Sequence, residues 1–210
     1  MSKTKTKQID EKQVSNGAEE LLSLAAPCTV SATIRGTVPL LFHSWNIESI
    51  DEKAAAPKNS KIKKTDNVES YVYRTEEGYL AVPGVNLHAA LIEAGRYIPD
   101  PRSPRKSARD LIKAAVTVLT EKAPFEPKTK EWDYEDRRRV VVQRAGITRT
   151  RPAMKEGWTL TYQILINLPE YCSEPFLKDL LERAGKSSGL CDFRPSYGRF
   201  QVIKYQTIVD

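Results

Sequence analysis

The sequence has few of the features that mark membrane, secreted or metal-binding proteins. No apolar run approaches the roughly 18 residues of a membrane helix, and the stretch MSKTKTKQIDEKQ lacks the apolar centre of a signal peptide. The three cysteines, Cys28, Cys172 and Cys191, are far apart and form no CxxC or His–Cys cluster. We therefore expect a soluble, cytoplasmic protein with reduced thiols, no metal and no cofactor.

Common catalytic motifs are also missing. HxxxH, GxSxG and Walker-type spacings are absent, which argues against the hydrolases and nucleotide-phosphate enzymes that carry them. Of the two histidines, His88 falls near the start of a predicted helix, whereas His43 follows the apolar run VPLLF, where a general base for RNA cleavage could emerge at a strand end. Asp51, beside a basic stretch, is the other weak catalytic candidate. Structural and surface roles are more common for such side chains.

The balance of charge favours an anionic partner. The chain has 33 Lys and Arg against 27 Asp and Glu, a formal net charge of +6 and an isoelectric point near 9.1. Basic side chains recur in three runs, at 53–64, 102–113 and 137–151, and the last holds six arginines and no acid. A single run is most often a solvated surface or a protected strand edge. The recurrence makes a nucleic-acid surface an equal alternative.

Guanidinium groups match phosphate oxygens in geometry and charge, so we expect the basic runs to bind a nucleic-acid backbone. The residues predicted to do so in the three runs are Lys61, Lys63, Lys64, Arg102, Arg105, Lys106, Arg137, Arg139, Arg144, Arg149 and Arg151.

The loop GLCDFRPSYGRF, residues 189–200, adds further candidates. Gly189 and Gly198 allow tight bends, so that three side chains would face a phosphate chain: Arg194, Tyr197 and Arg199. The alternative is a structural loop held on the core by aromatic side chains and by an acid paired with an arginine, which involves Phe193, Phe200 and Asp192.

The pattern of polar and apolar residues predicts one α+β domain. We expect 1–27 to be a flexible segment and 28–210 to be a single domain, with insertions near 46–70, a mobile basic loop, and near 99–136. Strands are predicted at 29–36, twice within 71–82 around a TEEG turn, in RRRVVVQR, at 158–168 and in FQVIKY. Trp158 and Tyr162 are assigned to the core.

Three helices complete the pattern. The first spans 86–97 and is capped by Asn86, the second starts near Ser107 and its apolar stripe reaches Val118, and the third starts at Pro175 and stops at Gly185. Without the insertions, the order strand, helix, strand, strand, helix, strand predicts a ferredoxin-like βαββαβ core, a modified RNA-recognition-motif arrangement.

Two stretches resemble the CRISPR-associated RAMP superfamily. GYLAVPGVNLHAALIEA resembles its strand, turn and first helix, and GLCDFRPSYGRFQV resembles its C-terminal glycine-rich loop and last strand. RRRVVVQRAGITRTRP and WTLTYQILI are similar in position to the Arg-rich strand and the strand after it in backbone-forming members. The resemblance covers most of 29–205. LLFH, VPG, RTRP and the loop also resemble a set found in phage proteins, which implies a phage- or mobile-element-borne relative.

Individual positions match or depart from the family motifs. In the turn the matches are Pro83, Gly84 and Asn86, and in the loop they are Gly189, Tyr197, Gly198 and Arg199. Residues of other types replace the usual glycines or lysine at His88, Ala89, Cys191 and Asp192.

The resemblance implies a protein that binds single-stranded guide RNA as a repeating backbone subunit of a ribonucleoprotein effector complex in CRISPR-type defence. Its partners would be single-stranded RNA, or single-stranded DNA, copies of itself and other subunits of the complex. Two alternatives remain open. One is a metal-independent endoribonuclease that processes guide RNA through His43. The other is a phage-encoded interaction or assembly protein without a nucleic-acid ligand.

Overall fold

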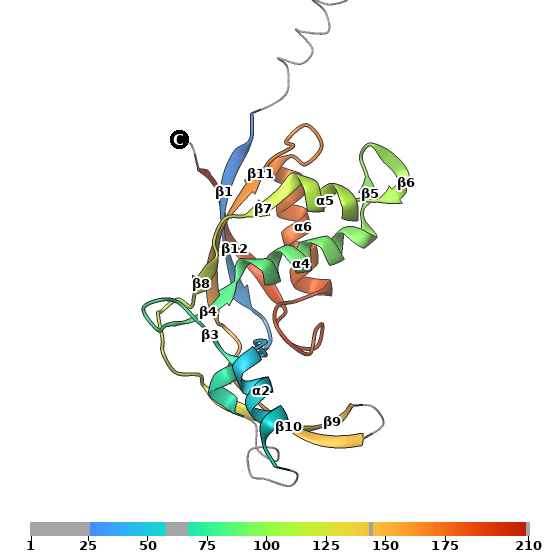
Figure 1. Ribbon diagram of the computed structural model, residues 1–210. Helices are drawn as coiled ribbons and strands as arrows, with labels where there is room; N and C mark the ends of the chain where they lie inside the picture. Colours follow the sequence, from blue (N-terminus) through green and yellow to red (C-terminus); the bar gives the residue numbers. More distant parts are fainter. Residues whose placement is uncertain (1–25, 58–66, 143–144, 209–210) are drawn as a thin grey trace, which may run out of the picture.

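A computed structural model describes residues 26–57, 67–142 and 145–208 of the chain (Figure 1). Most of the expected flexible segment 1–27, and the predicted ligands Lys61, Lys63, Lys64 and Arg144, lie outside the described residues. Within the described ranges the protein is a mixed α/β structure with antiparallel sheets. No helix in this part of the chain is both long enough and apolar enough to cross a membrane.

The largest sheet has four strands in the order β12-β1-β11-β7, and every neighbouring pair is antiparallel. Alternation explains its two faces, because Val30, Ala32 and Ile34 of the first strand are fully buried while the residues between them are not. The predicted strands at 29–36, 158–168 and FQVIKY are confirmed. The four strands are β1 (Cys28–Gly36), β7 (Val116–Val118), β11 (Thr159–Ile166) and β12 (Phe200–Ile208).

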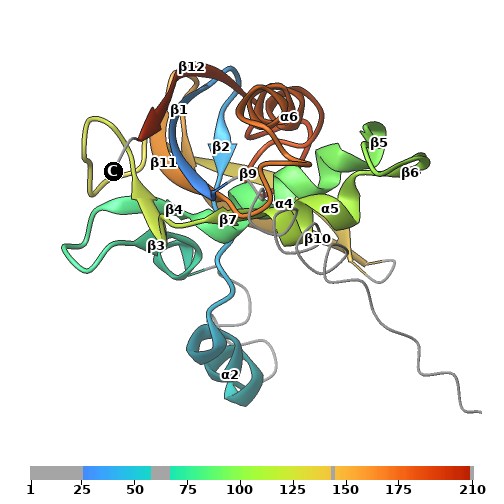
Figure 2. The same cartoon turned by 90° about the horizontal axis from the view of Figure 1, so that it is seen from above.

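The described helices that cover this sheet lie on one of its sides, where they enclose the core (Figures 1 and 2). Leu87 and Leu91 from one helix and Leu180 and Leu181 from another are fully buried there. Trp158 and Tyr162 are buried in the same core, as predicted. The elements are α4 (Gly84–Ala94), the 3₁₀ turn η2 (Gly95–Tyr97), α5 (Arg109–Ala115) and α6 (Glu174–Ser187).

Smaller sheets extend the structure beyond the main one. One has the order β3-β4-β8, another has the order β2-β10-β9, and two short strands form a separate hairpin, β5-β6. The bounds are β2 (Leu40–Leu41), β3 (Tyr73–Arg74), β4 (Leu80–Pro83), β5 (Pro99–Asp100), β6 (Ser103–Ser107), β8 (Lys122–Pro124), β9 (Tyr134–Val142) and β10 (Ala145–Met154). The two short strands around TEEG are confirmed by the pairing of β3 with β4.

The two predicted insertions contain more structure than expected. The range 46–70 holds α2 (Ile47–Ala55) and the start of the 3₁₀ turn η1 (Val68–Tyr71), so a mobile loop is the wrong description of those residues. The second helix ends at Ala115 and does not reach Val118, because the Val-Thr-Val stretch is extended and pairs with β11. Part of the range 99–136 therefore contributes a strand to the main sheet.

Other local predictions also need correction. Asn86 is not the cap of the first helix, because α4 starts after the extended Pro83 and places Asn86 in its first turn. The strand in RRRVVVQR exists as β9, but it pairs with β10 in a separate sheet. Ser173 caps α6 by accepting a hydrogen bond from the amide of Phe176.

Gly185 does not stop α6, which continues to Ser187. A Cβ atom at this position would lie 2.1 Å from the carbonyl oxygen of Phe200, the first residue of β12. The missing side chain therefore lets the helix approach the last strand closely. This contact fixes both ends of the loop that runs from α6 to β12.

Replacing Gly185 with alanine should destabilise the protein, although alanine favours helix formation. The new methyl group would collide with backbone that has no room to move, and we expect a loss of about 2 kcal/mol in the free energy of unfolding. The melting temperature measured by circular dichroism should fall by about 4–8 °C. The control Lys186→Ala changes the exposed neighbour and should have little effect. Equal melting temperatures for the two variants would contradict the proposed close contact.

Candidate nucleic-acid interface

The β9–β10 hairpin divides its arginines between two faces. Residues directly opposite each other in an antiparallel pair lie on the same face. Arg137 is opposite Thr150 and Arg139 is opposite Thr148, and both arginines are exposed. We call the face with Arg137 and Arg139 the outer face of the hairpin. The inner face is turned toward the loop 189–200.

Arg138 on the inner face joins the hairpin to this loop. Its guanidinium group forms a two-pronged pair with the carboxylate of Asp136 and donates to the hydroxyl of Tyr197. Its central carbon lies 5.0 Å from the ring centre of Phe193 and 4.8 Å from that of Tyr197. Hydrogen bonding to Asp136 raises the pKa of Arg138 further above its ordinary value. Arg138 is therefore a fixed cation within the protein.

Arg151 forms the second link between hairpin and loop. The residue is 8% exposed, its Nε atom contacts Oδ2 of Asp192, and its guanidinium carbon lies 4.7 Å from the ring centre of Phe193. Among the described residues no hydrogen-bond partner of correct geometry is found for its Nε or Nη1 atoms. The contact with Asp192 is therefore an ion pair without a well-aligned hydrogen bond. The Nδ1 atom of His43 lies 3.7 Å from the same carboxylate oxygen.

The backbone of the loop is anchored as well. Gly198 has φ of +72°, and a Cβ atom there would lie 2.0 Å from the carbonyl oxygen of Leu190. The amide of Leu190 donates to the carbonyl of Gly198 at 2.9 Å, and the amide of Gly198 donates to Pro39 at 2.9 Å. The amide of Asp192 donates to Leu41 of β2 at 3.1 Å. The loop therefore has a defined shape on the edge of the β2-β10-β9 sheet.

Two basic side chains of the loop remain exposed. These are Arg194 and Arg199, and Arg199 donates from its Nε atom to the carbonyl of Pro195 at 2.7 Å. The structural alternative for this loop is confirmed for Asp192, which pairs with Arg151, and for Phe200, which is 2% exposed. Arg151 and Tyr197, both expected to face a phosphate chain, are engaged in contacts inside the protein. Arg149 is half-buried on the inner face.

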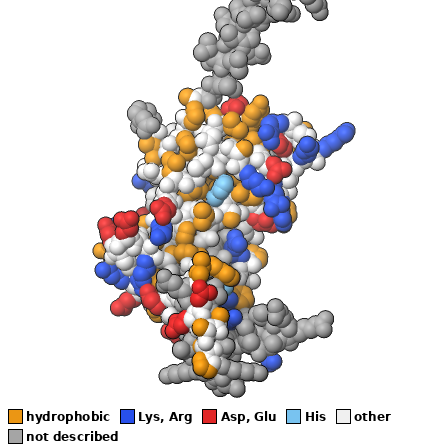
Figure 3. Space-filling view, viewed as in Figure 1, with side chains coloured by type: hydrophobic (Ala, Val, Ile, Leu, Met, Phe, Trp, Pro, Cys, Tyr) orange, Lys and Arg blue, Asp and Glu red, His pale blue; other side chains and the backbone are white. Residues whose placement is uncertain are grey.

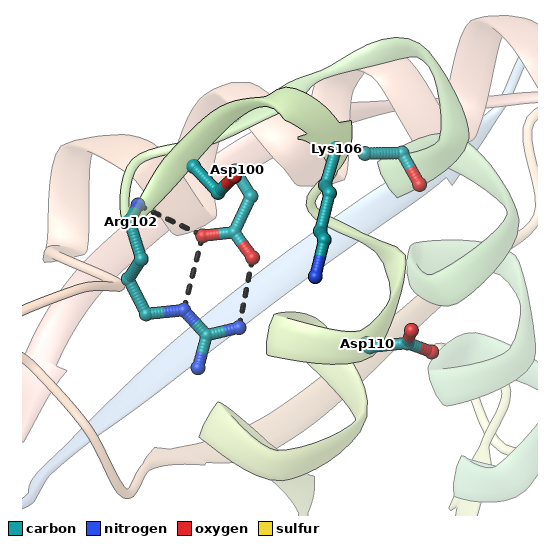
Figure 4. A pocket seen from close by; sticks show the side chains of 6 residues that line it. Asp100, Arg102, Lys106 and Asp110 are labelled. Atoms are coloured by element: carbon teal, nitrogen blue, oxygen red, sulfur yellow. Dashed lines mark hydrogen bonds and ion pairs between the residues drawn. The ribbon is translucent and has the colours of Figure 1, made fainter.

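The second basic run forms the β5–β6 hairpin, shown close by in Figure 4. The guanidinium group of Arg102 donates two hydrogen bonds to the buried carboxylate of Asp100, from Nε at 3.0 Å and from a terminal nitrogen at 2.8 Å. These hydrogen bonds lower the pKa of Asp100. Lys106 and Asp110 line the same hollow of about 650 Å³, and Arg105 and Lys106 are exposed. The hairpin thus offers two exposed cations and one that is paired.

The structure does not gather the basic runs into one surface. The β5–β6 and β9–β10 hairpins lie toward opposite ends of the molecule (Figure 1). In Figure 3, Lys and Arg side chains are visible around α5 and the β5–β6 hairpin and, mixed with acidic side chains, at the lower left of the view, with fewer near the β9–β10 hairpin. Arg137 and Arg139 are exposed on the outer face of the hairpin, whereas the exposed Arg194 and Arg199 belong to the loop that packs against its inner face.

The catalytic candidates are placed differently from each other. Asp51 is exposed on α2. His43 lies beside a different acid, Asp192 of the loop. His88 is partly buried, and desolvation lowers its pKa, which marks it as a group packed beside α5 and β7. Among the described residues no cluster of three or more His, Cys, Asp or Glu side chains is placed to hold a metal ion.

The open face of the main sheet has a polar character. Thr29, Ser31, Thr33 and Arg35 alternate with the buried residues of β1, and the hydroxyl oxygens of Thr33 and Thr161 lie 3.0 Å apart. Register places no aromatic side chain on this face among the described residues of the four strands. The face therefore lacks the rings on which RNA-recognition motifs stack bases.

These elements define an α+β protein with antiparallel sheets and a basic loop next to an Arg-rich hairpin. Among solved structures, the chain is similar to a chain in the cryo-EM structure of the type III-B Cmr-beta bound to cognate target RNA. The match has a TM-score of 0.52 and 12% sequence identity, and it covers 95% of this chain and 68% of the other. The likeness is one of fold. No protein-family model and no curated protein matches the sequence.

The pair of Arg151 and Asp192 predicts unequal effects of removing each partner. Asp192→Ala would leave a buried arginine without its charge partner, and we expect a loss of about 3 kcal/mol in the free energy of unfolding. Arg151→Met should cost less, about 2 kcal/mol, because the Asp192 side chain is 26% exposed and can be hydrated. Urea denaturation of both variants would measure the difference.

The matched control for this experiment is Asp179→Ala, which breaks an exposed pair with Arg183 on α6. Exposed pairs of this kind contribute little, so the control should change the free energy of unfolding by less than about 0.5 kcal/mol. An effect of Asp192→Ala no larger than that of Asp179→Ala would mean that the loop is not held by this pair.

Proposed function

We propose that this protein is an RNA-binding subunit of a CRISPR-type ribonucleoprotein complex, and that it binds single-stranded guide RNA as a repeating backbone subunit. The observation that carries the proposal is the pair of exposed arginines, Arg137 and Arg139, on the outer face of the hairpin. The exposed arginines of the anchored loop, which packs against the inner face, add further positive charge. The RAMP-like fold supports it. The similar Cmr-beta chain belongs to a complex whose structure was determined with target RNA.

The chemistry of the arginine group suits a sugar-phosphate backbone. Arg137 and Arg139 are two residues apart on one face of a strand, so their Cα atoms are about 6.6 Å apart and both guanidinium groups can reach successive anionic groups. Glu135 precedes them on the same face, but the inner arginines already use the nearby carboxylates of Asp136 and Asp192. With two arginines against one glutamate, the outer face keeps a net positive field for a ligand.

The polar face of the main sheet fits the same interpretation. Without aromatic side chains it offers no platform for splayed bases, so we expect binding through phosphates and not through base readout. Affinity should then depend steeply on salt and weakly on sequence. This expectation suits a subunit that covers a guide of any sequence.

We also propose a ferredoxin-like core for the domain. The order β12-β1-β11-β7, with α4 and α5 between β1 and β7 and with α6 between β11 and β12, is the arrangement of a split βαβ fold. In this view 28–210 is one domain, and the α2 region and the β8–β10 region are additions to its core.

The double variant Arg137→Ala/Arg139→Ala should weaken binding of an unstructured 30-nucleotide RNA about tenfold near 0.1 M salt. It should also lower the slope of log affinity against log salt by about 1.4, because each lost phosphate contact removes about 0.7 for a single strand. Fluorescence anisotropy over a salt series measures both quantities. The loss should be the same for RNAs of unrelated sequence.

The control for that experiment is Lys178→Ala/Arg183→Ala, which removes the same charge from the exposed side of α6. It should leave the salt slope unchanged. If the two double variants changed the affinity and the salt slope equally, binding would depend only on the net charge of the protein and not on the arginines of the hairpin. The absence of any RNA binding at low salt would reject the proposed function and favour an interaction or assembly protein.

One contact favours a second candidate function, a metal-independent endoribonuclease. Asp192 lies 3.7 Å from Nδ1 of His43 and would orient the ring as a general base. Against it, Arg151 pairs with the same carboxylate oxygen and competes for its charge. We therefore keep this activity as the alternative.

Labelled hairpin RNA incubated with the protein in EDTA tests the alternative directly. We expect the RNA to remain intact over hours at protein concentrations that saturate binding. His43→Ala is the matched variant, since His43 is exposed and its loss should leave the fold intact. Cleavage by the natural protein that disappears in His43→Ala would establish the nuclease and overturn our expectation.

A further inference from the structure

A cleft of about 860 Å³ lies between the helices and the loop, away from the outer face of the hairpin. We call it the helix–loop cleft. α4, η2, α5, the end of α6 and residues 191–195 of the loop form its walls. The side chains that give it its chemical character are Tyr97, Arg109, Lys113, Ser188, Phe193 and Arg194.

Two hydrogen-bond donors in the cleft are buried and unsatisfied. The Nε atom of Arg109 and the hydroxyl of Ser188 have no hydrogen-bond partner among the described residues. Ser188, the residue that ends α6, is 5% exposed. Leaving a buried donor without an acceptor costs free energy, so most such groups in proteins have a partner. A ligand with anionic oxygens would supply both acceptors.

The cleft keeps an excess of positive charge. Arg109, Lys113 and Arg194 line it, and Lys113 also lies 3.2 Å from Asp110 in an exposed pair of small electrostatic weight. The guanidinium group of an arginine stays charged at any physiological pH and can hold a phosphate with two hydrogen bonds.

The acidic groups that line the cleft are used elsewhere. Glu93 pairs with Arg96 at 2.7 Å, and Asp192 pairs with Arg151. Burial raises the pKa of Cys191 to about 12, so its thiol is neutral near pH 7 and adds no negative charge. An anion that enters the cleft therefore meets basic groups whose positive charge is not neutralised by the acidic side chains that line the cleft.

An aromatic ring is exposed at the edge of the cleft. Tyr97 is 71% exposed, although it follows directly on the buried end of α4. Phe193 also lines the cleft, but its ring is in contact with Arg138 and Arg151. A large ring left in water beside a basic cleft is a surface on which a planar base can stack.

We infer that the helix–loop cleft holds one nucleotide, with its phosphate bound by Arg109, Ser188 and Arg194 and its base stacked on Tyr97. The volume lies within the range of sites for small ligands. The inference rests on the proposed function in one respect, since we take the nucleotide to be a unit of a bound RNA strand. A free nucleotide has the same chemistry and is the other source that the experiment must separate.

The test has two arms, each with the natural protein, Tyr97→Ala, Arg109→Met and Ser188→Ala. The first is calorimetric titration with adenosine 3′,5′-bisphosphate, and with adenosine and inorganic phosphate singly. The second is anisotropy with a 12-nucleotide RNA. If the cleft takes a free nucleotide, the bisphosphate binds more tightly than either part, and each variant weakens it at least about fivefold. If it takes a unit of a strand, the same loss is seen with RNA.

Ser188→Ala also separates binding from folding. Removing a hydroxyl that has no partner should leave the melting temperature unchanged or slightly higher, so a loss of affinity in this variant cannot come from unfolding. Matched controls are Tyr171→Ala and Arg183→Met, an exposed tyrosine and an exposed arginine outside the cleft, which should leave both affinities unchanged.

The outcomes distinguish this inference from the proposed function. If the protein binds RNA, and the three cleft variants bind RNA and the bisphosphate as the natural protein does, the nucleotide site is refuted while the proposed function stands. If the bisphosphate binds through the cleft but RNA of any sequence does not bind, the site stands and the proposed function fails.

Discussion

The contact between the loop 189–200 and the inner face of the β9–β10 hairpin determines what the rest of this surface can do. Arg138 and Arg151 are held there by the carboxylates of Asp136 and Asp192 and by the rings of Phe193 and Tyr197. Taking an arginine out of water, partly as for Arg138 or almost fully as for Arg151, is costly unless it is paired, and here a strand or loop neighbour pairs each. These cations pair inside the protein, whereas Arg137 and Arg139 are exposed on the opposite face of the hairpin.

The same contact connects the surface to the core. The loop leaves α6 at the point where Gly185 lets the helix meet β12, and its other anchors are backbone hydrogen bonds to β2 and to Pro39. The hairpin is therefore joined through the loop to the last strand of the main sheet. On the other side of the loop, the helix–loop cleft is bounded by α4 and α5, whose positions depend on the main core. One loop thus forms a wall of two surfaces that carry positive charge.

Periodicity in the sequence predicts the parts of the fold in which one side of an element is buried. The strands β1 and β11 and the apolar stripes of α4 and α6 follow directly from alternation or from helical spacing. The boundary between α5 and β7 could not be found in this way, because Ala115 and Val118 fit both a helical stripe and a strand. The prediction that Gly185 ends the helix is wrong, because the role of this glycine is to let α6 approach β12 closely. The sequence of the helix alone does not reveal that contact.

The site was predictable only in part for a similar reason. Charge counting identifies the arginines of 137–151, but it does not separate Arg138 from its exposed neighbours Arg137 and Arg139. Strand alternation carries that signal, since every second residue of 134–139 faces inward. The pairing of Asp192 with Arg151 needs the tertiary structure. The helix–loop cleft, formed by five segments of the chain, has no counterpart in any single motif.

In the function that we propose, RNA contacts the outer face of the hairpin and the exposed arginines of the anchored loop, and not the open face of the main sheet. Photochemical cross-linking of 4-thiouridine-containing RNA, followed by mass spectrometry of the peptides, tests this claim most directly. We predict cross-links in 134–139 and 193–200, whose exposed arginines are Arg137, Arg139, Arg194 and Arg199. Cross-links concentrated on the polar face of β1 and β11 would contradict it.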